Sequence, residues 1–362
     1  MSAKVSRGST DVILELEDGS RYQGRSFGGE AVVAGEVVFN TAMAGYVESL
    51  TDPSYRGQIL ALTYPLVGNY GVPGPRAAGS LDGPFESGHI QASGLVVQSY
   101  CGHPSHAASR RTLGQWLSSE GVPGLTGIDT RALTLRLREQ GTMSGVLFPA
   151  DMDSKSAWAT GRRVEMTRQV FHDVAPTETV TYAGGPTRIV LVDCGAKDQI
   201  VRSLLRRGAT VVRIPWHSDV ASCLSSADGL LIGNGPGDPA DLDRLSSAVR
   251  AILDTFPGPV FGVCLGHQIL ARAIGASTYK LPYGHRGINH PVQELGTQRA
   301  FVTSQNHGFA VDDRTLPSDW RAWMVNLNDG TNEGIRAAAR PHWSVQFHPE
   351  GSPGHWTAKG VH

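Results

Sequence analysis

The order of apolar and polar positions predicts a β-rich first part of the chain. Apolar residues alternate with polar ones over 12–16, and Asp18-Gly19 follows as a turn before a second extended stretch. Apolar runs at 31–39 and 58–63, separated by loops that contain glycine and proline, predict two further strands. A polar, glycine-rich stretch at 71–88 predicts a long loop.

One helix is expected in this first part. Leu133 and Leu137 lie four residues apart, which places them on one face of a helix, and Gly141 follows as a stop. The strands and this helix together predict a β-rich α/β domain over residues 1–150. A polar stretch at 151–186, which ends in Gly-Gly-Pro, predicts the linker that follows.

After residue 186 the pattern changes, because apolar runs and helical patterns begin to alternate. Such alternation is typical of βαβ units that surround a buried parallel sheet. We therefore expect an α/β domain over 187–362, with a mainly parallel central sheet flanked by helices. The predicted strands are 189–192, 211–214, 230–232 and 260–263, and the predicted helices are 199–207, 241–253 and 268–274.

Cys264 is the candidate nucleophile. It stands at the centre of a Gly-x-Cys-x-Gly sequence (262–266), between a predicted strand and a predicted helix. This is the pattern of a nucleophile elbow with sulfur in place of oxygen. The free N–H groups and dipole at the start of the following helix favour a thiolate. Cys101, Cys194 and Cys223 lack this setting and are interpreted as structural.

A candidate general base follows the predicted strand 343–347. A thiolate nucleophile needs an imidazole that exchanges protons with it, and the imidazole needs an acceptor on its other nitrogen. His348 and Glu350 can supply these groups, because Pro349 constrains the chain so that both side chains project to one side. His-Pro-Glu alone is a weak motif, but together with Cys264 it predicts a catalytic triad.

A glycine-rich turn at 233–239 is the candidate oxyanion site. Three glycines in five residues can present backbone N–H groups to a developing oxyanion. The turn also begins like a dinucleotide-binding fingerprint, but Asp238 stands where glycine or alanine is required, and Pro236 and Pro239 crowd the turn. No P-loop sequence is present either, so the sequence predicts acyl transfer without an ATP site.

Composition narrows the class of protein. The chain has 362 residues, 40% of them apolar and 18% charged, as expected for a soluble protein of two domains. Lys and Arg number 32 against 33 Asp and Glu, without a sustained basic run, so neither nucleic acid nor a membrane surface is an expected partner. No long apolar run and no apolar leader is present, so neither a membrane span nor secretion is expected. The four irregularly spaced cysteines favour a protein of the reducing cytoplasm.

A metal site was weighed at Cys101, His103 and His106, which could supply three ligands from one loop. No second cluster has the spacing of a zinc site, so no metal is expected in this chain.

Three motifs together resemble the signatures of class I (triad) glutamine amidotransferases: 234–239, 262–268 and 348–350. Motifs in and beyond the first domain narrow the resemblance to the small subunit of carbamoyl-phosphate synthetase. These lie at 35–41, 43–46, 50–55, 129–131, 284–291 and 305–309. The likeness runs from about Val12 to Gly354.

The resemblance implies hydrolysis of glutamine to glutamate and ammonia through a cysteinyl thioester. The ammonia would pass through a tunnel to a large subunit that makes carbamoyl phosphate from bicarbonate and ATP. ATP and magnesium are expected on that subunit and no cofactor in this chain, and the two subunits would form a heterodimer. Whether the product serves pyrimidine synthesis, arginine synthesis or a specialised pathway stays open.

The resemblance also implies roles for individual residues. Cys264, His348 and Glu350 would form the triad, and the N–H groups of Gly235 and Leu265 the oxyanion hole. The expected glutamine contacts are Ser54, Gly235, Gly237, Leu265, Gln268, Asn306, Gly308 and Phe309. Because Ser54 belongs to the first domain, the pocket is expected to border the domain interface.

The last residues depart from the family pattern. After 352–354 the family normally continues into a closing helix, whereas here 356–362 follows without an apolar helical period. The triad is complete without that helix, so catalysis is still expected, in a somewhat less stable domain.

Two alternatives were weighed. An amidotransferase that feeds purine, CTP or anthranilate synthesis is compatible with the triad, but those families lack a domain that resembles residues 1–150. A non-catalytic regulatory subunit on the same fold is disfavoured by the intact Cys264, His348 and Glu350, since triad members act as a unit.

Overall fold

The computed structural model describes residues 11–351 and divides into two compact units, Met1–Val164 and Glu165–His362. Each unit is described by itself. The stretch expected as a linker, 151–186, contains α4 (Ser154–Thr160), α5 (Arg168–Val174) and β8 (Val180–Tyr182). The unusual tail at 352–362 lies outside the described residues.

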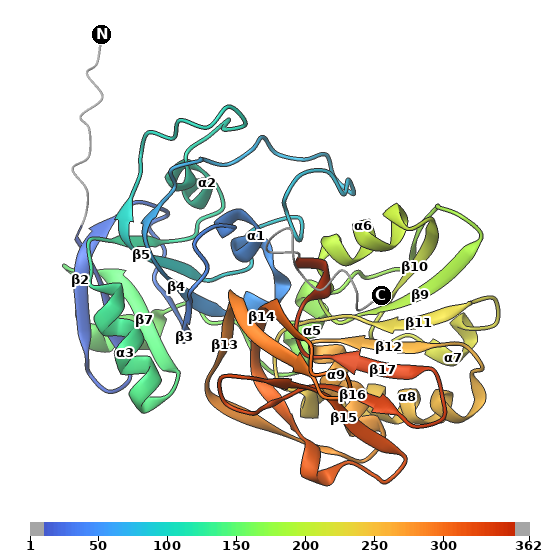
Figure 1. Ribbon diagram of the computed structural model, residues 1–362. Coiled ribbons are helices and arrows are strands. Elements are labelled where there is room, and N and C mark those ends of the chain that lie inside the picture. Colours follow the sequence, from blue (N-terminus) through green and yellow to red (C-terminus); the bar gives the residue numbers. More distant parts are fainter. Residues whose placement is uncertain (1–10, 352–362) are drawn as a thin grey trace. The chain divides into compact units, whose positions relative to one another are not determined.

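The first unit is a closed barrel in the order β1-β2-β6-β5-β4-β3-β7 (Figure 1). β1 and β2 pair antiparallel across the predicted turn, whereas β3, β4, β5 and β6 pair parallel in sequence. The strands are β1 (Asp11–Leu16), β2 (Arg21–Ser26), β3 (Val33–Asn40), β4 (Gln58–Val67), β5 (Gly94–Tyr100), β6 (Gly124–Thr126) and β7 (Met143–Pro149). The helices besides α4 are α1 (Tyr46–Thr51), α2 (Leu113–Ser119) and α3 (Thr130–Gln140). The β-rich character predicted for this part is confirmed.

Helix α3 shows how local sequence sets an element. The side chain of Asp129 accepts a hydrogen bond from the N–H of Ala132 at 2.9 Å and so caps the first turn. Leu133 and Leu137 are fully buried, as their spacing predicts. Gly141 follows the last turn with φ 90°, a conformation that glycine adopts without strain.

The second unit is built on a ten-stranded sheet, with strands in the order β14-β13-β15-β16-β17-β12-β11-β9-β10-β8. Its middle, from β17 to β10, is parallel, which confirms the predicted α/β class. The strands besides β8 are β9 (Thr187–Asp193), β10 (Ala209–Pro215), β11 (Gly229–Ile232), β12 (Val260–Val263), β13 (Ser277–Glu294), β14 (Ala300–Asp312), β15 (Trp320–Asn326), β16 (Asn332–Ala337) and β17 (His342–Val345). The helices besides α5 are α6 (Asp198–Arg206), α7 (Val220–Cys223), α8 (Asp243–Thr255) and α9 (Leu265–Ala273).

The antiparallel side of this sheet did not figure in the sequence predictions. β13 and β14 are long paired strands at its edge, drawn in orange in Figure 1, and β15 and β16 join them to the parallel middle. α9 begins at Leu265, directly after Cys264 and earlier than the predicted start at residue 268. Among residues 11–351 no helix has the length and apolarity needed to cross a membrane.

The two faces of α3 give a matched stability test. We expect Leu133→Ala to lower the free energy of unfolding by about 2–5 kcal/mol, because it leaves a cavity in a closely packed core. Leu135→Ala, on the same helix but 45% exposed, should change it by no more than about 0.5 kcal/mol. Thermal unfolding followed by circular dichroism measures both. Equal shifts in the two midpoints would contradict this account of the helix.

Candidate active site

Cys264 occupies a strained turn between β12 and α9. Its φ is 55°, in the left-handed region that residues with a Cβ rarely adopt. A Cβ on Gly262 would lie 2.5 Å from the carbonyl oxygen of Gly266, and a Cβ on Gly266 would lie 2.0 Å from that of Ile232. Both glycines are therefore required by the close approach of strand and helix. The sharp turn between strand and helix is compatible with a nucleophile elbow, and the role of Cys264 as the nucleophile stays a prediction.

His348 and Glu350 follow β17 and are both buried. The ring Nδ1 of His348 lies 2.7 Å from the Oε1 of Glu350, so the carboxylate orients the imidazole and fixes the proton on that nitrogen. The backbone N–H of His348 donates to the carbonyl of Ser304 at 2.8 Å, which holds the residue against β14. Its Nε2 has no hydrogen-bond partner in the described part of the chain. Cys264 is among the groups that raise the pKa of the ring.

The charges at this site are strongly coupled. Burial opposes a charged imidazole, but Glu350 and Cys264 together outweigh it and raise the pKa of His348 to about 10. Burial likewise opposes a charged carboxylate, yet His348 and Lys197 together lower the pKa of Glu350 to about 2. The site therefore holds a carboxylate and an imidazolium as a buried pair at neutral pH.

Lys197 is a further candidate site residue, which the sequence patterns did not indicate. Its Nζ lies 3.3 Å from the Oε1 of Glu350, and both side chains are more than nine-tenths buried. The backbone N–H of Lys197 donates to the Oδ1 of Asn234 at 2.9 Å. The available signal was position, because Lys197 comes just after β9, at the carboxyl end of a parallel strand, where sites of this fold form.

The glycine-rich turn follows β11, the strand beside β12. A Cβ on Gly235 would lie 2.2 Å from the carbonyl oxygen of Cys194, so only glycine fits there. Gly237 has φ 81°, which again favours glycine. The turn follows β11 and α9 follows the neighbouring strand β12, so the two segments begin side by side. The backbone N–H groups of Gly235 and Leu265 stay predicted donors to the oxyanion.

Besides Gly235 and Gly237 of the glycine-rich turn, the predicted substrate contacts in the second unit come from α9 and β14. The Sγ of Cys264 lies 3.6 Å from the carbonyl oxygen of Asn306. The Nε2 of Gln268 donates to the carbonyl of Phe309 at 2.9 Å and to the Oε1 of Gln346 at 3.1 Å. Gly308 lies between Asn306 and Phe309 on β14. Because Asn306 contacts the Sγ of Cys264, this strand borders the candidate nucleophile.

Ser54 belongs to the first unit. It lies in the short 3-10 helix η1 (Pro53–Tyr55), where its backbone N–H donates to the Oδ1 of Asp52 at 2.9 Å. Its contact with glutamine stays a prediction.

Possible metal ligands gather away from the loop that the sequence singled out. His285, His307 and Glu333 bring three ligand atoms within 4.8 Å of one another, the one such group among residues 11–351. These side chains already take part in a hydrogen-bond network: His285 Nε2 lies 2.8 Å from Asp329, and His307 Nε2 lies 2.8 Å from Gln305.

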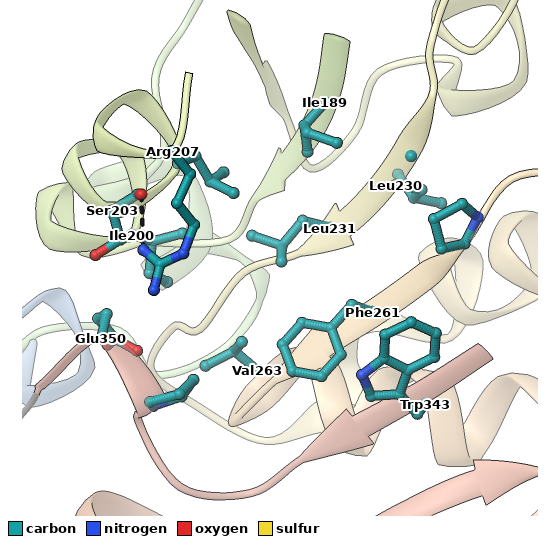
Figure 2. A pocket seen from close by; sticks show the side chains of 14 residues that line it. Ile189, Ile200, Ser203, Arg207, Leu230, Leu231, Phe261, Val263, Trp343 and Glu350 are labelled. Carbon is teal, nitrogen blue, oxygen red and sulfur yellow. Dashed lines mark hydrogen bonds between the residues drawn. The ribbon is translucent and has the colours of Figure 1, made fainter. Parts of the chain in front are cut away.

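A cavity of about 370 Å³ lies behind Glu350 (Figure 2). Apolar side chains of α6 and of the parallel strands line most of it, among them Ile200, Leu231 and Phe261. Glu350 stands at one end of the cavity, whereas Cys264 is not part of its lining.

Comparison with known proteins agrees with the two-unit architecture. The family described as carbamoyl-phosphate synthase small chain, CPSase domain, matches residues 14–147, and glutamine amidotransferase class-I matches residues 190–360. The arginine-specific small chain of carbamoyl phosphate synthase from Aspergillus oryzae is 45% identical over 94% of this chain and 76% of its own length.

Longer relatives contain the same region. Multifunctional protein CAD of Squalus acanthias is 48% identical, and multifunctional protein pyrABCN of Emericella nidulans is 45% identical, each over 94% of this chain. This chain spans only 15% and 16% of their lengths. Family models match both units of this chain, and the chain covers 76% of the Aspergillus oryzae small chain. The protein therefore belongs to the carbamoyl-phosphate synthase small chain family, with a class-I glutamine amidotransferase domain.

Proposed function

We propose that this chain is the glutamine-hydrolysing subunit of a carbamoyl-phosphate synthetase. The observation that carries the proposal is the buried array of Cys264 in a strained elbow and His348 oriented by Glu350. The match of residues 14–147 to the small chain disfavours an amidotransferase of another pathway. The intact triad disfavours a purely regulatory subunit.

The proposed reaction is acyl transfer in two steps. The thiolate of Cys264 attacks the carboxamide carbon of glutamine, and the N–H groups of Gly235 and Leu265 stabilise the resulting oxyanion. His348 gives its proton to the leaving nitrogen, so ammonia departs and a thioester remains. His348 then takes a proton from the water that attacks the thioester. Glutamate leaves and its new carboxyl group gives its proton to solvent, which restores the thiolate of Cys264 beside protonated His348.

The remaining assignments concern substrate and partner. The proposed glutamine contacts are Ser54, Gly235, Gly237, Leu265, Gln268, Asn306, Gly308 and Phe309. We propose a large subunit as the partner, which receives the ammonia and binds ATP, magnesium and bicarbonate, because this sequence holds no P-loop. We propose the cytoplasm as the location of the pair, and pyrimidine and arginine synthesis as the two candidate destinations of the product.

Replacement of the nucleophile gives the first test. Cys264→Ala should lower the rate of glutamine hydrolysis by about 10³-fold or more, because the covalent route is lost. Cys223→Ala, which changes a partly buried cysteine on α7, should leave the rate unchanged. Glutamate release measures both. Hydrolysis by Cys264→Ala at the unaltered rate would exclude the mechanism.

The coupled charges predict opposite pH effects for two variants. Glu350 raises the pKa of His348, so Glu350→Gln should lower it and move the alkaline limit of kcat/KM to lower pH. Lys197 lowers that pKa, so Lys197→Met should move the limit to higher pH. Profiles of glutamine hydrolysis between about pH 5 and 11 measure both directions. Shifts of the same sign in the two variants would contradict the assignment.

The absence of a P-loop predicts dependence on a partner. Hydrolysis of glutamine by this chain alone should be slow and should rise when the large subunit, ATP and bicarbonate are present, since a free glutaminase would waste glutamine. Glutamate release with and without the co-purified large subunit measures the difference. Equal rates would rule out this coupling.

A further inference from the structure

The loop between β9 and α6, residues 193–198, touches two parts of the active site. Through Lys197 it places a positive charge 3.3 Å from Glu350, and through the N–H of Lys197 it binds the side chain of Asn234. Through Cys194 it packs against Gly235, where its carbonyl oxygen fills the space that a Cβ would need. The position of this loop therefore bears on both the triad and the glycine-rich turn.

A single carboxylate shapes the loop. The Oδ1 of Asp193 accepts hydrogen bonds from the N–H groups of Gly195 and Ala196, both at 2.7 Å. Asp193 is fully buried, so its charge needs a partner within the protein.

Arg213 supplies that partner from the neighbouring strand β10. Its Nε donates to the Oδ2 of Asp193, its Nη1 to the Oδ1 of Asp198 at 3.0 Å, and its Nη2 to the carbonyl of Ala196 at 3.0 Å. Its side chain is only 12% exposed. One planar guanidinium thus binds the loop at its start, in its middle and at its end.

The chemistry of arginine explains why this residue type stands there. The guanidinium presents several donors in a rigid fork, whereas a lysine ammonium is a point charge on a flexible stem. Arg213 pairs in register with Leu191 on β9, so the fork is anchored to the sheet from which the loop emerges. Lys197 itself has a long, flexible side chain, and holding its backbone limits the positions that its ammonium group can reach.

We propose that Arg213 is a positioning residue, which fixes the 193–198 loop so that Lys197 lies beside Glu350 and the triad keeps its charge balance. The inference rests on the proposed glutamine hydrolysis only for its kinetic consequences. Arg213 does not touch the reacting groups in the proposed mechanism, and it acts through Lys197.

The proposal predicts a shared signature for Arg213 and Lys197 variants. Arg213→Lys keeps the charge but loses the fork, and it should lower kcat about 10- to 100-fold with a smaller change in KM, because a displaced catalytic group loses its alignment. Its pH profile should shift in the same direction as that of Lys197→Met. The double variant should show no further loss beyond Lys197→Met alone, since coupled residues are not additive.

Arg272→Met is the matched control. Arg272 also forms an ion pair with an aspartate, Asp243, but this pair lies on α9 and α8 and is partly exposed. Its removal should leave kcat and the pH profile unchanged. Circular dichroism of Arg213→Lys separates a displaced loop from an unfolded domain. Asp198→Asn, which removes the negative charge but keeps an acceptor oxygen at one contact of the fork, gives a milder second variant.

The last measurement is the rate at which iodoacetamide alkylates Cys264 as a function of pH, which does not require glutamine. The alkylation rate of the Cys264→Ala variant is subtracted as background. Matching shifts of this profile in Arg213→Lys, Asp198→Asn and Lys197→Met support the inference even if glutamine is not the substrate. A wild-type profile in Arg213→Lys and Asp198→Asn, or fully additive losses in the double variant, would overturn it. A wild-type protein that is alkylated normally but releases no glutamate would instead refute the proposed function.

Discussion

The clearance between β12 and α9 is the constraint on which the rest of the site depends. The helix approaches the sheet so closely that a side chain at Gly262 or Gly266 would collide with backbone oxygens. Cys264 is held between them at φ 55°, and its N–H donates to the carbonyl of Val345 on β17. The strain at this residue is therefore sustained by packing on both sides, as is common where a structure presents a reactive group. The other proposed catalytic groups follow the strands on either side of this turn.

The parallel part of the sheet explains why parts distant in sequence meet. β9, β11, β12 and β17 lie side by side, and Lys197, the turn 233–239, Cys264 and His348 each follow the carboxyl end of one of them. Parallel strands end at the same edge, so four loops converge there without any long connection. The antiparallel strand β14 then closes one side of this edge with Asn306 and Phe309. The candidate nucleophile thus lies next to both the parallel middle and an antiparallel strand of the same sheet.

Much of this could be predicted from the sequence, where the signal is local. The cap of α3, its buried Leu133 and Leu137 and the glycines of the elbow each follow from a few neighbouring residues. Lys197 and the long β13–β14 pair were not predicted for the same physical reason. The role of Lys197 depends on Glu350, more than a hundred residues away, and the β13–β14 strands are irregular in register and mix buried with exposed positions. Contacts of this kind leave no period in the sequence that a local pattern can detect.

The order of charges at the site ties these observations together. Lys197, Glu350 and His348 follow one another at 3.3 Å and 2.7 Å, and the thiolate proposed at Cys264 would come next, so positive and negative groups alternate. Each buried charge then has an opposite neighbour, which offsets the large cost of removing it from water. In the proposed mechanism the negative charge passes from the sulfur to the oxyanion when the bond forms. The positive charge of His348 is lost when its proton passes to the departing nitrogen and the oxyanion collapses, so one charge of each sign disappears over the step. The alternation therefore stays balanced through the step, and a displacement of the cation at its far end would be felt at the sulfur through the two groups between them.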